Sequence, residues 1–248
     1  MRVKLVVAYD GTKYCGWQVQ PNGITIEAVL NKELSALFHQ PITVIGASRT
    51  DSGVHAEGNV AVFDVDTLIP ADKIAYALNV SLPEDIVIQS SVEVPEDFHP
   101  RYAKTRKTYE YRILNTQMPM PVRRLDTYFY HYDLNLEVMQ EAAKILIGEH
   151  DFTSFASIHS QTKSFVRTIY DVKVLQDKNH VIVLRISGNG FLYHMVRIIA
   201  GTLIQVGSGR IESEKMEQIL QAKNRAAAGP TAPPQGLTLM EIQYEEKS

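Results

Sequence analysis

The sequence predicts an α+β protein in which helices cover a mostly antiparallel sheet. Short runs of alternating apolar or β-branched residues are typical of strands, and they occur between segments whose apolar residues follow helical spacing. In the first hundred residues the predicted order is strand, helix, strand, strand, helix, strand. This order favours a layer of helices on a sheet of mostly antiparallel strands.

The first half of the chain has the clearest patterns. Val3, Leu5 and Val7 lie at every second position, which is the periodicity of a strand. Thr25 is the expected N-cap of a helix, and Pro70 is expected to open another. The predicted elements are a strand over residues 2–9, a helix over 26–38, strands over 42–45 and 59–65, a helix through Leu78, and a strand over 86–94.

The acidic, Pro-punctuated segment 95–100 predicts a domain boundary. It gives an N-terminal domain over residues 1–99 and a C-terminal domain over residues 100–248. The elements predicted in the second domain are strands over 108–114, 128–132, 165–175 and 181–186, a helix from Leu136 to Leu146, helices over 191–206 and 212–222, and a strand over 238–244.

Composition excludes several classes of protein. The chain has 248 residues, of which 45% are hydrophobic and 21% charged, as in ordinary globular proteins. No apolar run reaches the roughly 20 residues of a membrane span, and residues 1–4 do not resemble a signal peptide. Cys15 is the only cysteine, so no internal disulfide can form and a cytoplasmic location is expected. No spacing of Cys and His suggests a metal site.

The most informative stretch is Gly46–Ala56, a polar loop between two predicted strands. Rigid strands commonly hold catalytic groups on such loops. Gly46 and Gly53 allow the backbone to turn with positive φ or to approach a ligand closely. Between them lie a guanidinium, hydroxyls and a carboxylate, and an imidazole follows. The alternative is an ordinary hairpin loop in which Asp51 caps its own turn, and the loop alone leaves both interpretations open.

Arg197 is the second signal, because it lies in the predicted helix 191–206 among residues that are apolar on nearly every face. A buried guanidinium is costly without a carboxylate and further acceptors. One interpretation is that Arg197 faces Asp51 across a cleft between the two halves and favours its ionised form. The other is that Arg197 reaches the surface or pairs with a structural acid.

The segment from Arg101 to Arg112 combines five cationic residues with three tyrosines and one acid. Cations at this density suit phosphates, and interleaved aromatic rings suit unstacked bases. Strand alternation places Tyr109 and Tyr111 on one face. The alternative is a solvated basic strand with cross-strand aromatic pairs. Further along, the Pro- and Gly-rich segment 228–237 is either the wall of a pocket or a linker to the last strand.

Four blocks of the sequence carry a family resemblance. They are GASRTDSGVHA at residues 46–56, KTYEY at 107–111, GFLYHMVR at 190–197 and AGPTAPP at 228–234. These blocks closely resemble motifs of the TruA family of tRNA pseudouridine synthases and occur in that family's order. The resemblance covers essentially the whole chain. Ser48 stands where the family usually has glycine, and Ser52 where alanine is common.

The resemblance implies two ferredoxin-like α/β subdomains with joined sheets and a central cleft, in a homodimer that shares one tRNA. It implies an isomerase that converts uridine to pseudouridine at positions 38, 39 and 40 of the tRNA anticodon arm. Asp51 matches the family's nucleophilic aspartate, and Arg197 matches the arginine that pairs with it. Tyr109 matches the tyrosine that stacks on the target base, and Arg49 the arginine that occupies the space of the flipped nucleotide. His55 is a further candidate for substrate binding, with a structural role as its alternative.

The implied chemistry needs no redox change and no net hydrolysis, so no cofactor is expected, and neither DNA nor a membrane is expected as a partner. Moving the uracil out of the stack costs a few kcal/mol, which stacking on an aromatic ring offsets. Three routes stay open for Asp51: attack on the sugar, addition to the base, or removal of a sugar proton. Two rival functions are a non-catalytic RNA-binding module and a glycosidase-like hydrolase, which would normally need a second acid.

Overall fold

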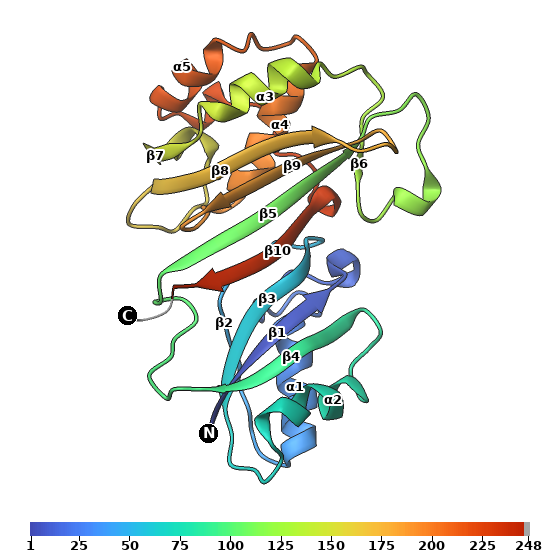
Figure 1. Cartoon of the computed structure of the whole chain (residues 1–248), viewed down its shortest axis with the longest axis vertical. Helices are drawn as coiled ribbons and strands as arrows, with labels where there is room; N and C mark the ends of the chain where they lie inside the picture. Colours follow the sequence, from blue (N-terminus) through green and yellow to red (C-terminus); the bar gives the residue numbers. More distant parts are fainter. Residues whose placement is uncertain (246–248) are drawn as a thin grey trace. The chain divides into compact units, whose positions relative to one another are not determined.

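The computed structural model describes residues 1–245 (Figure 1). It confirms the predicted α+β class, because the described residues form five α-helices and mixed, mostly antiparallel strands. They divide into two compact units. Unit 1 contains Met1–Thr105 together with Leu239 and the described residues after it, and unit 2 contains Arg106–Thr238. The closing strand thus belongs largely to unit 1, whereas the division expected from the sequence places it with the second half.

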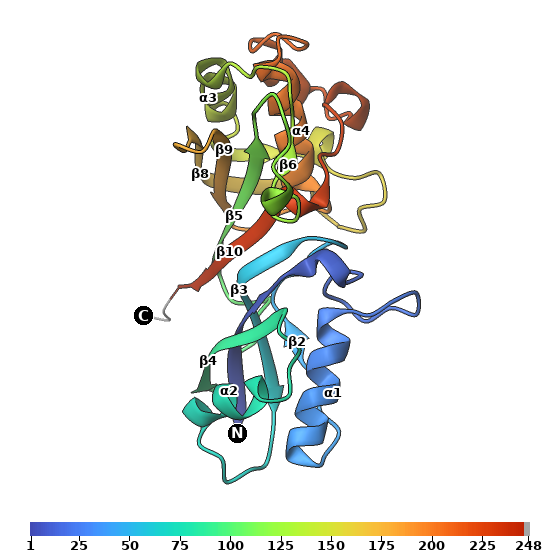
Figure 2. The same ribbon diagram turned by 90° about the vertical axis from the view of Figure 1, so that its right-hand side faces the viewer.

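Unit 1 repeats the predicted order of elements. Its strands are arranged β4-β1-β3-β10, with β2 attached to β3, and β1 is antiparallel to both β3 and β4. Figure 2 shows α1 lying beside these strands. The elements are β1 (Arg2–Tyr9), α1 (Ile26–Phe38), β2 (Ile45–Gly46), β3 (His55–Asp64), α2 (Ala71–Asn79), β4 (Ile86–Val94) and β10 (Leu237–Tyr244).

Local sequence explains these elements. Every second residue of β1 from Val3 to Tyr9 is buried, as the alternation predicts. The predicted cap of α1 is present, since the Thr25 hydroxyl accepts a hydrogen bond from the Ala28 N–H at 3.3 Å. His39 adopts the left-handed conformation, with φ 51°, and ends the helix.

The strands of unit 2 lie in the order β5-β9-β8-β7, with β6 pairing parallel to β5. Figure 2 shows α4 beside β5, and α3 contacts both α4 and β8. Although α4 is apolar, no helix in the described part of the chain is long and apolar enough to cross a membrane. The elements are β5 (Thr105–Leu114), β6 (Tyr128–Phe129), α3 (Leu136–Lys144), β7 (Gly148–Asp151), β8 (Val166–Gln176), β9 (Val181–Gly188), α4 (Met195–Gly207) and α5 (Lys215–Gln221).

Two elements near the predicted site do not begin where the sequence predicts: α4 begins later and β3 begins earlier. The helix predicted from residue 191 begins at Met195, because His194 adopts a left-handed conformation with φ 63°. Arg197 therefore lies in the first turn of α4 rather than in the middle of a helix. Strand β3 begins at His55 rather than at Asn59, so His55 belongs to a strand.

One acidic residue links the ends of β1 and β3. The Arg2 guanidinium donates to both carboxylate oxygens of Asp64, at 2.8 and 2.7 Å, and these hydrogen bonds lower the pKa of Asp64 against the opposing effect of burial. Ionised Asp64 therefore stabilises the fold above its unfolded pKa of about 3.9, and this contribution is lost as the pH falls through the lower folded-state pKa.

We expect Asp64→Asn to lower the unfolding free energy at pH 7 by less than about 1 kcal/mol, because the pair is partly exposed. The gap between wild type and variant should close as the pH drops below about 4. Urea unfolding at a series of pH values measures this gap, and a gap independent of pH would contradict the assignment.

Candidate active site

The predicted catalytic loop lies in unit 1, between β2 and β3. Ser48 and Thr50 are buried, whereas Arg49 is exposed and Asp51 is half-buried. The buried residues anchor the loop in the protein. Asp51 is therefore a partly exposed residue on an anchored backbone.

Hydrogen bonds fix the backbone that precedes Asp51. The Thr50 carbonyl accepts the Trp17 N–H at 3.1 Å, and the Thr50 hydroxyl lies 2.8 Å from the Tyr9 hydroxyl. The Asn59 amide donates to the same Tyr9 hydroxyl at 3.2 Å. Strands β1 and β3 thus hold this side of the loop through buried polar groups, which are costly to leave without partners.

A second set of hydrogen bonds fixes the backbone that follows Asp51. The Gly53 N–H and the Ser52 hydroxyl both donate to the Tyr14 carbonyl, at 3.3 and 3.2 Å. The Val54 N–H donates to the Asp51 carbonyl at 3.1 Å and closes a turn. The loop is therefore tied to residues 14–17 on both sides of Asp51.

The two predicted roles of glycine are both present in this loop. Gly53 has φ 76°, in the left-handed region. Gly46 lies against the indole of Trp17, where an added Cβ would be 2.3 Å from Nε1. A side chain at position 53 would be strained by this backbone conformation, and one at position 46 would displace Trp17.

A substitution at Gly16 tests how much its close approach to the loop contributes to stability. It has φ 83°, and an added Cβ would lie 2.5 Å from the Thr50 carbonyl oxygen. We expect Gly16→Ala to lower the unfolding free energy by about 2–4 kcal/mol, through left-handed strain together with displacement of the loop backbone. Urea unfolding measures the loss.

Gly209→Ala is the matched control, because Gly209 has φ 73° and nothing within 4 Å of an added Cβ. It should show the strain alone, about 1–2 kcal/mol. Equal losses of unfolding free energy in the two variants would mean that the close approach of Gly16 to Thr50 does not contribute to the loss.

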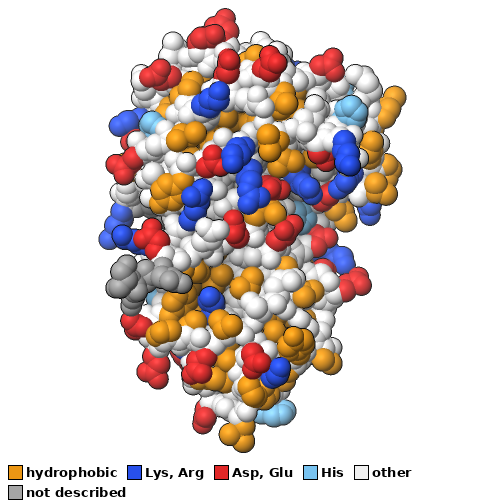
Figure 3. Space-filling view, in the orientation of Figure 1, with side chains coloured by type: hydrophobic (Ala, Val, Ile, Leu, Met, Phe, Trp, Pro, Cys, Tyr) orange, Lys and Arg blue, Asp and Glu red, His pale blue; other side chains and the backbone are white. Residues whose placement is uncertain are grey.

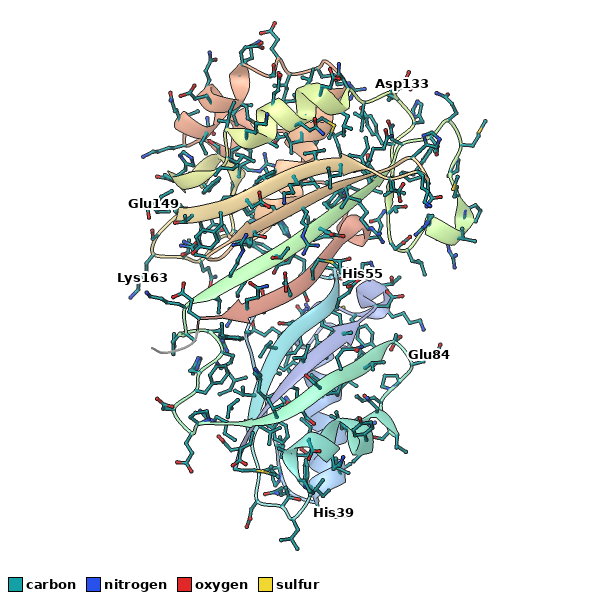
Figure 4. The ribbon with its side chains drawn as sticks, in the orientation of Figure 1. His39, His55, Glu84, Asp133, Glu149 and Lys163 are labelled. Carbon is teal, nitrogen blue, oxygen red and sulfur yellow. The ribbon has the colours of Figure 1, made fainter. Side chains whose placement is uncertain are left out.

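His55 is buried at the start of β3 (Figure 4). Its Nδ1 accepts the Gly11 N–H at 3.1 Å and lies 3.1 Å from an Asp10 carboxylate oxygen. Burial raises the pKa of Asp10, but hydrogen bonds from Thr12 and the interaction with His55 outweigh it and lower the pKa. Within the described chain, no three His, Cys, Asp or Glu side chains are grouped to hold a metal ion. These contacts give His55 a role in holding the 10–12 turn, and contact with a substrate stays a prediction.

Two tyrosines of β5 are buried in unit 2, on one face of the strand as alternation predicts. The Tyr109 ring meets the Phe191 ring edge-on, with centroids 5.1 Å apart. The Tyr111 hydroxyl donates to the Pro233 carbonyl at 2.8 Å. Burial raises the pKa of Tyr111 above its usual value, and the charge of Arg197 acts against this rise. Tyr111 and Arg197 therefore lie within electrostatic range.

Arg197 is half-buried and is held through its Nε, which donates to the Ala232 carbonyl at 2.8 Å. The Ala232 N–H donates in return to the Arg197 carbonyl at 3.0 Å. One of the acceptors that a secluded guanidinium needs is thus a backbone carbonyl. The expected partner Asp51 belongs to unit 1, and the pairing stays a prediction.

The segment 228–237 packs along α4. The Gly229 N–H donates to the Thr202 hydroxyl at 2.9 Å, and the Arg225 guanidinium lies 3.2 Å from the Thr231 hydroxyl. Together with the contacts of Ala232, these bonds make the segment part of the packed structure rather than a free linker.

Two charged side chains of the 101–112 segment contact side chains on other strands of unit 2. The Arg106 guanidinium lies 5.5 Å from the centre of the Tyr170 ring, and Glu110 pairs with Arg185 across the strands at 2.7 Å. Figure 3 shows Lys and Arg side chains gathered over this sheet, interspersed with acidic ones. The surface in this view is therefore of mixed sign.

The residues that hold the predicted catalytic loop were not among those predicted. Tyr14 and Trp17 are buried although they lie in a loop, and Gly11 and Gly16 bring that loop against residues 50–54. The available signal was a loop with two large aromatic residues and closely spaced glycines, which is unusual for a solvated connection.

Comparison with known proteins decides the family. A family model described as tRNA pseudouridine synthase matches residues 5–103 and 142–245. The chain belongs to this family. The family consists of isomerases that act on uridine in tRNA. The first matched segment contains Asp51 and the second contains Arg197, whereas Tyr109 lies between them.

Similar proteins in bacteria cover the whole chain. A protein of Thermoanaerobacter sp. (strain X514), named tRNA pseudouridine synthase A, is 47% identical over 242 residues, which are 98% of this chain and 99% of that protein. Proteins with the same name from Clostridium acetobutylicum and Citrifermentans bemidjiense are 46% and 42% identical, over 98% and 99% of this chain and 99% and 98% of their own. The resemblance based on four motifs is thereby confirmed.

Proposed function

We propose that this protein converts uridine to pseudouridine at positions 38, 39 and 40 of the tRNA anticodon arm. The observation that carries the proposal is the half-buried Asp51, on a loop whose backbone is hydrogen-bonded on both sides, in a chain of the tRNA pseudouridine synthase family. A fixed carboxylate suits a reaction that begins with attack or proton removal at a defined atom.

Each proposed role uses a feature of the individual residue. Asp51 is the nucleophile, and Arg49, which is exposed beside it, occupies the space of the flipped nucleotide. Tyr109 stacks on the flipped base and assists removal of the C5 proton, and its ring is oriented by Phe191. His55 either contacts the substrate or holds the turn before the loop.

Arg197 is proposed to pair with Asp51. Support comes from its fixed Nε and from the cost of a secluded guanidinium without a carboxylate. Such a pair would place a positive charge beside the carboxylate when the substrate excludes water. The pairing requires that the two units meet with these side chains facing each other across a central cleft.

The proposed reaction is an isomerisation. The uridine leaves the stack at a cost of a few kcal/mol, offset by stacking on Tyr109 and by phosphate contacts. The bond between N1 and C1′ breaks, the uracil turns, and C5 bonds to C1′. C5 then releases its proton and N1 takes up a proton, so the product is an isomer of the substrate. Asp51 acts by attack on the sugar, by addition to the base, or by removal of a sugar proton.

The assembly is proposed as two ferredoxin-like subdomains with joined sheets, in a cytoplasmic homodimer that shares one tRNA. The order of elements in unit 1 supports the ferredoxin-like description. Light scattering of the purified protein, with and without tRNA, tests the stoichiometry.

The deciding experiment uses tRNA that carries tritium at uridine C5. Isomerisation releases the label to water, whereas an RNA-binding module releases none and a hydrolase releases free uracil. Transcripts with cytidine at position 38, 39 or 40 assign the positions. Label release from a transcript that lacks uridine at all three would refute the assignment.

A further inference from the structure

We infer that Tyr14 is a positioning residue for Asp51. The Tyr14 carbonyl fixes the backbone that follows Asp51. The Tyr14 side chain is held by Asp85 and thereby keeps this carbonyl in place. The inference rests on the proposed role of Asp51 and deepens it. It assigns a part in the reaction to residues 10–14 and 85, which lie outside the catalytic loop.

The first step of the argument is the contact with the loop. A carbonyl oxygen has two lone pairs, and both donors that reach the Tyr14 carbonyl, the Gly53 N–H and the Ser52 hydroxyl, come from the two residues that follow Asp51. Any movement of Tyr14 therefore moves the peptide next to Asp51. A misplacement of about 1 Å at a reacting group costs about 100-fold in rate.

The second step is the anchor of Tyr14. The Tyr14 hydroxyl donates to a carboxylate oxygen of Asp85 at 2.5 Å, and the Asp85 carbonyl accepts the Asp10 N–H at 3.0 Å. The Tyr14 N–H donates to the Gly11 carbonyl at 3.0 Å. Asp85 thus holds both ends of the 10–14 turn, one through its side chain and the other through its backbone.

The third step is the state of the hydroxyl. Tyr14 is buried, and burial, followed by the hydrogen bond and negative charge of Asp85, raises the pKa of Tyr14 above its usual value. The hydroxyl therefore stays protonated and donates at neutral pH. Lys13 lies 3.4 Å from the other Asp85 oxygen but is exposed, so the buried phenol is the main constraint.

The test compares two substitutions of tyrosine by phenylalanine within unit 1. Tyr14→Phe keeps the buried ring and removes the bond to Asp85. Tyr244→Phe is the matched control, because it removes a hydroxyl that donates to the Pro100 carbonyl at 3.2 Å. The readouts are amide hydrogen exchange of residues 52–54, the single-turnover rate of tritium release, and the Kd for tRNA.

We expect Tyr14→Phe to speed exchange of the Gly53 amide and to lower the single-turnover rate, each by about tenfold, with an unchanged Kd. Tyr244→Phe should change none of the three. A Tyr14→Phe protein with wild-type exchange, or with faster exchange and an undiminished rate, overturns the inference. So does an equal loss of rate in Tyr244→Phe.

Two substitutions of Asp85 test the anchor. Asp85→Asn keeps an acceptor and should retain most of the rate, whereas Asp85→Ala removes it and should match Tyr14→Phe. The double variant with Tyr14→Phe and Asp85→Ala should lose no more of the rate than either single variant, because both substitutions break the same hydrogen bond. Additive losses would show that the two residues act separately and would overturn the inference.

Failure of the proposed function can be distinguished from failure of the inference about Tyr14. If the wild-type protein releases no tritium from tRNA, the proposed function fails, yet the exchange measurement still shows whether Tyr14 holds the loop. Wild-type exchange in Tyr14→Phe would then overturn the inference as well, by an independent measurement.

Discussion

Asp51→Asn is expected to abolish pseudouridine formation and to leave tRNA binding largely intact. The amide has nearly the shape of the carboxylate, so the bonds from Thr50, Ser52 and Gly53 that fix the loop should persist. An amide is a far weaker nucleophile and base, and we expect the isomerisation rate to fall by about 10⁴-fold or more. Single-turnover tritium release measures the rate, and fluorescence anisotropy measures the Kd.

Asp66→Asn is the control for this substitution, because Asp66 is an exposed acid in the same unit. It should retain the wild-type rate. Wild-type turnover by Asp51→Asn would remove Asp51 from the mechanism, and loss of tRNA binding would mean that the carboxylate acts in recognition. Asp51→Ala should agree with Asp51→Asn, since both lack the carboxylate.

Arg197→Lys is expected to lower the rate by about 100-fold or more, although the charge is retained. Lysine has no Nε to donate to the Ala232 carbonyl, and its ammonium cannot replace the planar, two-point contact proposed for Asp51. The rate of tritium release as a function of pH measures the effect. The Kd for tRNA should change much less than the rate.

Arg210→Lys makes the same substitution at an exposed arginine just after α4 and should leave the rate unchanged. Thermal unfolding of Arg197→Lys separates a loss of fold from a loss of chemistry. A normal rate with an unchanged pH profile in Arg197→Lys would contradict the proposed pairing.

Much of the fold could be predicted because it depends on local patterns. The alternation in residues 2–9 and the Thr25 cap are properties of a few adjacent residues, and both were predicted correctly. Strand β7 was missed because Gly148–Asp151 has no β-branched or alternating apolar residues, and it is held by pairing with β8. The start of α4 was placed too early because apolar spacing continues through residues 191–194, whereas His194 has a backbone that no helix accepts.

The sequence alone suggests the residues proposed for the site, but not the residues that hold them in place. Asp51 stood out as the carboxylate of a polar loop between two predicted strands, and Arg197 as a charged residue among apolar ones. The supports Tyr14 and Asp85 are 71 residues apart in the sequence, and no local pattern relates them. Likewise, the hold on Arg197 comes from a backbone carbonyl, which any residue at position 232 would supply.

The inclusion of β10 in unit 1 has a consequence for biosynthesis. A ribosome adds about 5–20 residues per second, and N-terminal domains generally fold first as they emerge. Here the strand that lies next to β3 is translated only after all of unit 2. The half that carries Asp51 must therefore wait until the rest of the polypeptide has been made, with one flank of β3 paired only to the two residues of β2. Nascent chains stalled before residue 237 should need protection from aggregation.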